Sequence, residues 1–364
     1  MITMMTVSPF LPSIELFIVG RFIIGFFAVT DTQSFVIINE YVGSHHRPII
    51  SNLLWVIWAV AECALPLKAY YINNWRMLYV LCSAPYAFVL CSWWFVPESA
   101  RWLSVNGKTD EAMGLLRRVA RFNNTQLPDK CVLECPADCN SGERVTFLDL
   151  FTSGRILAIR TLIQTLIWVS IGLVYYGITI AAADLGGNLY INFVLGSLVE
   201  IPAYLICMWG VNQLGRKAMT ISSMIASSLG CILVYLMPIN HPIWGPLRII
   251  VGTLSKLFVC INFSSIYSWS IELFPTRLRA IGFGFLVVMS QLGGAGSPWL
   301  AKALIPISPP LPFIVMGSVG LLTGMLMFLL PETKDLKTLE IVENQKNMDV
   351  VINNNNADNS WDKQ

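Results

Sequence analysis

The chain has 364 residues, of which 55% are hydrophobic and only 13% are charged. Soluble globular chains carry about 25% charged residues, so this composition, with a mean hydropathy of +0.62, excludes an ordinary soluble enzyme. A net charge of +2 without clustered basic residues also argues against a nucleic-acid-binding surface. Runs such as 78–96 and 311–330 contain no Asp, Glu, Lys or Arg, and their length matches the ~20 residues that cross a ~30 Å hydrocarbon layer.

Apolar runs separated by charged residues, glycine and proline predict the membrane-spanning segments. Nine are expected, at 12–39, 50–71, 76–96, 159–184, 189–211, 217–238, 246–271, 280–304 and 311–330. Lysine and arginine are concentrated in alternate loops, and loops rich in these residues stay in the cytoplasm. We therefore expect the C-terminal tail inside and the residue-1 end outside. Because no signal peptide precedes that outer end, the simplest expectation is a chain whose first helices are missing.

An internal repeat supports that expectation. Gly20 recurs as Gly252, Glu40 as Glu272 and Arg47 as Arg279, each 232 residues later. Two homologous halves are therefore predicted, with six spans in the second and three in the first, which is nine of twelve. Parallel six-helix halves are the architecture of major facilitator transporters.

The predicted organisation has four parts. Residues 1–100 form the remainder of the N-terminal half, with three helices, and 159–334 form the C-terminal six-helix half. Between them, 101–158 is expected to be a cytoplasmic loop with an amphipathic helix at 110–121, where apolar residues recur at helical spacing. The polar tail at 335–364 is expected to be cytoplasmic and disordered.

Several motifs identify a family. The segments Trp93–Leu103, Leu198–Pro202, Glu272–Arg279 and Pro331–Lys334 resemble the exit and helix motifs of the organic cation, carnitine and organic anion transporter family of the major facilitator superfamily. The resemblance implies an all-α, polytopic membrane fold and alternating access. The chain departs from the family in the loop between the eighth and ninth helices, where Asn212 and Gln213 replace an acidic residue and an arginine.

Ionisable residues inside predicted spans are the main site candidates, because a charged group at the bilayer centre costs about 2.5 kcal/mol or more. These residues are Asp31, Glu62, Glu200 and Lys256. The resemblance implies that Lys256 and Glu200 occupy the family's charged positions in the tenth and eighth helices. It further implies that Trp168, Tyr175 and Tyr176 line the central cavity in which the family's carriers bind substrate. Gln291 would take the position in the eleventh helix that selects the charge of the substrate.

Structural alternatives stand beside these roles. Asp31 or Glu62 can hydrogen-bond to a neighbouring helix or be protonated, and Lys256 can pair with a carboxylate without contacting substrate. The aromatic residues can be packing residues. The expected gating residues at helix ends are Glu40, Arg47, Glu272, Arg279, Glu98 and Arg101, and plain solvation of helix ends is the alternative for them.

The sequence predicts no metal site and no cofactor. Cys131, Cys135 and Cys139 have no histidine nearby, whereas zinc sites pair such units with a second one or with histidines. No nucleophile motif or phosphate-binding loop is present, so we expect no enzymatic activity.

These observations predict transport of a small organic ion across the lipid bilayer of the plasma membrane. Aromatic faces attract a desolvated cation by about 2 kcal/mol, so a cation or a carnitine-like zwitterion is favoured. The alternative is a transport-incompetent truncated isoform or fragment that acts by association with a full-length carrier.

Overall fold

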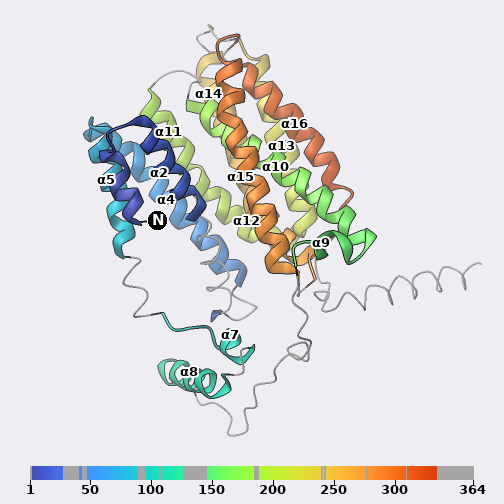
Figure 1. The fold of residues 1–364 in the computed structure, drawn as a ribbon. Coiled ribbons are helices and arrows are strands. Elements are labelled where there is room, and N and C mark those ends of the chain that lie inside the picture. Colours follow the sequence, from blue (N-terminus) through green and yellow to red (C-terminus); the bar gives the residue numbers. More distant parts are fainter. Residues whose placement is uncertain are drawn as a thin grey trace, which may run out of the picture. The chain divides into compact units, whose positions relative to one another are not determined.

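Helices are the regular secondary structure of the part of the chain that the structure, a computed structural model, describes (Figure 1), which confirms the all-α fold class. The described residues are 2–27, 41–42, 47–88, 96–105, 108–125, 146–183, 188–238, 241, 243–275, 278–308 and 310–333. The helices are α1 (Ile2–Val7), η1 (Ser8–Phe10), α2 (Ile14–Phe27), α4 (Arg47–Tyr71), α5 (Trp75–Ser83), η2 (Ala84–Tyr86), α7 (Ala100–Val105), α8 (Thr109–Phe122), α9 (Asp149–Thr152), α10 (Arg155–Ala183), α11 (Leu189–Leu198), α12 (Glu200–Leu214), α13 (Arg216–Leu236), α14 (Trp244–Leu273), α15 (Arg279–Leu304) and α16 (Leu311–Met327).

Six helical segments among the described residues are long and apolar enough to cross a membrane. They are Asn52–Tyr71, Arg155–Ala181, Leu189–Leu214, Arg216–Leu236, Trp244–Leu273 and Arg279–Leu304. The apolar helix α16 is shorter, and it covers most of the span expected at 311–330. The spans expected at 12–39 and 76–96 begin as α2 and α5 and continue into residues outside the described part. A total of nine spans therefore remains a prediction.

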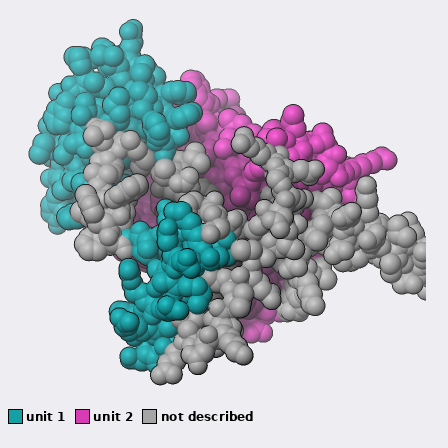
Figure 2. All heavy atoms as spheres, turned by 60° about the horizontal axis from the view of Figure 1, so that its bottom comes forward, with its two compact units in different colours: residues 1–54, 64–144 teal, residues 55–63, 145–364 magenta. Residues whose placement is uncertain are grey.

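The chain divides into two compact units, which Figure 2 colours separately. Unit 1 comprises residues 1–54 and 64–144, and unit 2 comprises residues 55–63 and 145–364. The middle of α4 thus belongs to unit 2, although the sequence assigns all of α4 to the N-terminal half. The four predicted parts of the chain remain predictions.

Unit 1 contains two features that follow directly from its sequence. The Asn74 side chain accepts a hydrogen bond from the backbone N–H of Arg76, 3.0 Å away, and so caps the start of α5. Helix α8 buries Ala112 and Leu115 against Leu103 of α7 and exposes its charged face. The amphipathic helix expected at 110–121 is therefore confirmed as α8.

In unit 2 the helices α10, α13, α14, α15 and α16 run side by side (Figure 1). Their outer faces carry exposed apolar residues such as Leu166, Leu233 and Trp299, as expected for surfaces in contact with lipid. Small polar residues lie inside instead. Ser227 of α13 donates a hydrogen bond to the carbonyl of Ser255 on α14, with 2.9 Å between the oxygens. Small residues at helix contacts are how membrane helices approach closely without a hydrophobic driving force.

Helices α10 and α15 approach most closely at two glycines. A Cβ atom on Gly293 would lie 2.0 Å from the carbonyl oxygen of Val169, and one on Gly172 would lie 2.1 Å from that of Ser290. Since each glycine lies directly against the other helix's backbone, only glycine fits there. We call this contact the α10–α15 seam.

The span expected at 189–211 is divided into α11 and α12 at Val199. Pro202 has no N–H to offer the carbonyl of Leu198 four residues earlier, which interrupts the helical hydrogen-bond pattern. The interruption makes Glu200 the first residue of α12, where it is fully buried.

Candidate functional site

A buried ion pair lies at the centre of unit 2. Lys256 Nζ on α14 is 2.9 Å from Oε1 of Glu200 on α12, and the two side chains are 3% and 0% exposed. Tyr175 of α10 donates its hydroxyl to the same oxygen at 3.1 Å, and Tyr204 donates to Oε2 at 2.9 Å. Gly196 of α11 lies against the lysine, since a Cβ there would be 3.5 Å from Nζ. Helices α10, α12 and α14 therefore contribute side chains to one hydrogen-bonded cluster around the Lys256–Glu200 pair.

Glu62 adds a second carboxylate to this pair. Its Oε1 lies 3.8 Å from Lys256 Nζ, and its side chain is 15% exposed. Its other oxygen, Oε2, is buried and has no hydrogen-bond partner within the described part of the chain. We call Glu62, Glu200 and Lys256 the charged triad; with both carboxylates ionised it carries one excess negative charge.

A group of aromatic rings adjoins the charged triad through Tyr175 and Tyr204. Tyr175 stacks on Phe263, with ring centroids 4.9 Å apart, and Phe263 in turn contacts Tyr267 at 5.2 Å. Trp55 of α4 meets Tyr204 at 5.9 Å and Tyr267 at 5.1 Å. Tyr175 and Tyr204 are therefore both ring partners of the aromatic group and hydrogen-bond donors to Glu200. The arrangement can offer a cation both negative charge and ring faces.

Trp168 lies deeper in the same aromatic group. It is fully buried, donates Nε1–H to the Ser270 hydroxyl at 2.9 Å, and contacts Tyr267 at 4.9 Å. Because the indole is buried and its N–H is already hydrogen-bonded, the position fits the alternative that Trp168 is a packing residue.

Gln291 and Tyr176 lie where α10 meets α15. Gln291 is exposed on α15, and one turn along, Gly294 is so close to Tyr176 that a Cβ there would be 2.5 Å from the tyrosine ring. Tyr176 is half-buried and contacts the Tyr175 ring, with centroids 5.2 Å apart. The structure thus brings Glu62, Glu200, Lys256 and both tyrosines together. Asp31 lies outside the described residues.

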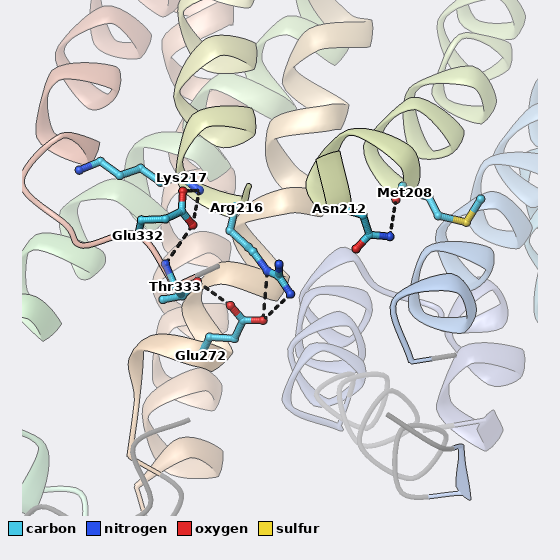
Figure 3. A network of polar contacts seen from close by, with 7 residues as sticks. All are labelled: Met208, Asn212, Arg216, Lys217, Glu272, Glu332 and Thr333. Atoms are coloured by element: carbon cyan, nitrogen blue, oxygen red, sulfur yellow. Dashed lines mark hydrogen bonds and ion pairs between the residues drawn. The ribbon is translucent and has the colours of Figure 1, made fainter. Parts of the chain in front are cut away.

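A second polar network ties three helix ends of unit 2 together (Figure 3). Arg216 Nε donates to Oε1 of Glu272 at 3.2 Å, and the Thr333 hydroxyl donates to Oε2 at 2.5 Å. The Lys217 N–H donates to Glu332 at 3.1 Å. Gly215 turns the chain from α12 into α13 with a φ of 94°, a left-handed conformation that favours glycine and sets Arg216 at the start of α13.

Two of the expected gating residues, Glu272 and Arg279, have hydrogen-bond or ion-pair partners near these helix ends. Glu272 pairs with Arg216, whereas Arg279 Nε donates to the backbone carbonyl of Ile271 at 3.0 Å. Asn212 donates to the carbonyl of Met208 in its own helix at 3.3 Å and stays apart from the network (Figure 3).

The other expected gating residues lie in unit 1. Glu98 is exposed and lines a surface pocket of about 540 Å³ with Lys108 and Glu111. Glu40 and the side chains of Arg47 and Arg101 lie outside the described part.

Sequence reasoning missed three residues that complete these networks. Tyr204 follows Glu200 by one helical turn, and this i, i+4 spacing could have predicted their contact. Trp55 and Arg216 have no comparable local signal, because their partners come from helices far along the chain.

Comparison with known proteins identifies the family. A family model described as "Sugar (and other) transporter" matches residues 1–344. The chain is 33% identical over 336 residues to "Solute carrier family 22 member 15-like" of Xenopus tropicalis, covering 91% of this chain and 68% of that protein. It is 32% identical to mouse "Solute carrier family 22 member 3", covering 93% and 60% of the two chains. It is 30% identical to the "Organic cation transporter protein" of Drosophila melanogaster, covering 92% and 61%. The chain thus spans 60% to 68% of the length of these relatives.

Solved structures show the same fold. The proton:xylose symporter XylE matches with a TM-score of 0.60 at 19% identity, over 86% of this chain and 70% of that one. A D-xylose-proton symporter matches with a TM-score of 0.61 at 17% identity, over 92% and 80%. The sequence relatives and the fold agree with the helices described above, and both are those of transporters rather than enzymes. The chain therefore has the major facilitator fold and belongs to the sugar (and other) transporter family, and within it to solute carrier family 22.

Proposed function

We propose that this membrane transporter carries a small organic cation or carnitine-like zwitterion by alternating access, with the charged triad and its aromatic neighbours as the substrate site. The observation that carries the proposal is the charge of the triad, in which two carboxylates face one lysine. A quaternary ammonium group would be attracted by that excess charge and by the faces of the neighbouring rings. An anionic substrate would instead be repelled by the second carboxylate, Glu62.

Tyr175 is the residue that joins the two parts of the site. Its hydroxyl holds Glu200, and its ring stacks on Phe263. Truncating it should therefore weaken binding of a cation through both contacts, while leaving the Lys256–Glu200 pair in place.

Uptake into proteoliposomes containing the purified chain tests this proposal. Labelled tetraethylammonium and carnitine should accumulate with saturable kinetics, and glutarate, a dicarboxylate, should not. Tyr175→Ala should raise KM about tenfold or more. Trp299→Ala, whose side chain is 79% exposed on α15, is the matched aromatic control and should leave KM unchanged. Preferential uptake of glutarate would overturn the assignment of substrate charge. No uptake of any probe, together with binding to a longer relative, would favour the alternative of a transport-incompetent partner protein.

Asp31 extends the proposal to the N-terminal half. An additional carboxylate in a predicted span would add to the negative potential that attracts a cation. Asp31→Asn should lower cation uptake without lowering the amount of protein in the membrane. Unchanged uptake would remove Asp31 from the site.

For the gate, we propose that the network of Arg216, Glu272 and Thr333 holds one state of the cycle closed at the cytoplasmic face. The repeat supports an equivalent role for Glu40, Arg47, Glu98 and Arg101 in the first half. The distribution of lysine and arginine supports a cytoplasmic C-terminus and a position of this network on the cytoplasmic side of the membrane. The relatives support the plasma membrane as the location of the protein. Labelling of an epitope tag after residue 364, in intact and in permeabilised cells, tests the orientation. Labelling only after permeabilisation is expected.

A further inference from the structure

Arg248, near the start of α14, is a buried cation that no described group neutralises. Its side chain is only 3% exposed, and its Nε has no hydrogen-bond partner within the described part of the chain. None of the ion pairs among the described residues includes it, whereas Lys256 on the same helix pairs with two carboxylates. Arginine keeps its proton in proteins, and an uncompensated charge inside a protein is costly. Arg248 therefore needs an anion.

The first turn of α14 is a second source of positive potential. The helix begins at Trp244, its N-cap residue Ile243 makes no side-chain capping bond, and no acidic residue lies in the first turn. The positive end of the helix dipole is therefore not offset by a carboxylate of its own turn.

Arg248 and this first turn come together at Gly245. Helical side chains lean toward the N-terminus of their helix, so Arg248 extends toward the turn that contains Gly245, three residues earlier. A Cβ atom on Gly245 would have no atom within 4 Å outside its own stretch of helix backbone, so the space beside this residue is open. An ion in that space can interact with both the guanidinium and the positive end of the helix.

We propose that Arg248 and the first turn of α14 bind one small monovalent anion, such as chloride, beside Gly245. The ligand is small because so little of the Arg248 side chain is exposed, and a single negative charge is enough to neutralise one guanidinium. The site is separate from the charged triad, because Arg248 precedes Lys256 by two helical turns, which is about 12 Å along the axis. The inference therefore does not depend on which substrate the transporter carries.

Bound chloride should stabilise the purified full chain in detergent. At constant ionic strength, replacing about 300 mM gluconate with chloride should raise the thermal unfolding midpoint by about 3 °C if the dissociation constant is about 10 mM. The rise should saturate as chloride increases. Arg248→Gln should abolish it. Lys302→Gln removes an exposed cation from α15, and this matched control should retain the full rise.

A second variant and a direct binding measurement keep the proposal testable if Arg248→Gln does not fold. Gly245→Leu would fill the open space while leaving the guanidinium in the protein, and it should weaken chloride binding about tenfold or more. Radioactive chloride should bind to the wild-type chain at about one ion per molecule, and bromide should displace it while gluconate should not.

Three results would overturn the site. The first is an equal chloride effect in the wild type and Arg248→Gln, and the second is wild-type affinity in Gly245→Leu. The third is no displaceable chloride binding by the wild type. The sequence also contains a rival partner, Asp184, which directly follows α10 and lies outside the described residues. If Asp184→Asn and Arg248→Gln cost the same stability and neither loss depends on chloride, Asp184 is the partner and the anion site is wrong.

Discussion

Arg216 at the start of α13 and Glu272 near the end of α14 form an ion pair with 3.2 Å between Nη2 and Oε1, although 56 residues separate them in the chain. Thr333, which follows α16, donates its hydroxyl to the second oxygen of the same carboxylate. One glutamate near the end of α14 therefore connects the start of α13 with the segment that follows α16.

Breaking this ion pair should lower stability moderately. Arg216→Ala or Glu272→Gln is expected to cost about 1 kcal/mol, because the side chains are only partly buried, and the double variant should cost less than the sum of the two. Thermal unfolding in detergent measures both effects. Lys108→Ala breaks an ion pair whose side chains are 52% and 62% exposed, and it should leave the unfolding midpoint unchanged. Strictly additive losses for Arg216 and Glu272 would contradict the coupling.

Replacing Lys256 should be much more damaging than replacing an exposed lysine. Lys256→Met removes the cation from two buried carboxylates, and breaking a buried pair by removing one partner costs about 3–5 kcal/mol. Lys256→Met with Glu200→Gln should recover much of the loss, because no uncompensated charge then remains at Glu200. The yield of monodisperse protein and its unfolding midpoint give the comparison. Lys302→Met, at an exposed position of α15, is the control. If the double variant were no more stable than Lys256→Met, the pairing would not explain the burial of Glu200.

Trp168 should affect stability rather than substrate affinity. Trp168→Phe keeps an aromatic ring but removes the donor to Ser270, and loss of one hydrogen bond is expected to cost about 1 kcal/mol. The KM for tetraethylammonium should stay within about twofold of the wild-type value, because Trp168 is fully buried behind Tyr267. Uptake kinetics and thermal unfolding separate these two effects. A large rise in KM with unchanged stability would instead place Trp168 in contact with substrate.

Two glycines of α15 should respond oppositely to alanine. Gly293→Ala would place a methyl group 2.0 Å from a backbone oxygen of α10 and should abolish folding of unit 2. Gly296→Ala meets only the flexible side chain of Leu173 at 3.7 Å, and it should stabilise the helix by up to about 1 kcal/mol. Expression level and the unfolding midpoint of the two variants are the readouts. Normal folding of Gly293→Ala would contradict the close approach.

The spans and the amphipathic helix could be predicted from the sequence because each depends on local patterns. Long apolar runs give the membrane helices, and apolar residues at helical spacing give α8. The break before Glu200 likewise has a local cause, since Pro202 lacks a backbone donor.

The partners of the charged residues could not be predicted in the same way. The repeat marks Glu272 as a gating candidate but does not identify its partner, which is Arg216 from another helix. Similarly, the sequence shows that Lys256 needs a carboxylate, but Glu200 and Glu62 lie on different helices, and only the packing of α4, α12 and α14 decides which is nearer.

The α10–α15 seam has a consequence for the route that a substrate can take. At Gly172 and Gly293 the two backbones touch with no side chain between them, so not even a water molecule fits through at these points. A lipophilic cation dissolved in the bilayer therefore cannot pass sideways between the two helices at the level of these glycines, however strongly it partitions into the membrane.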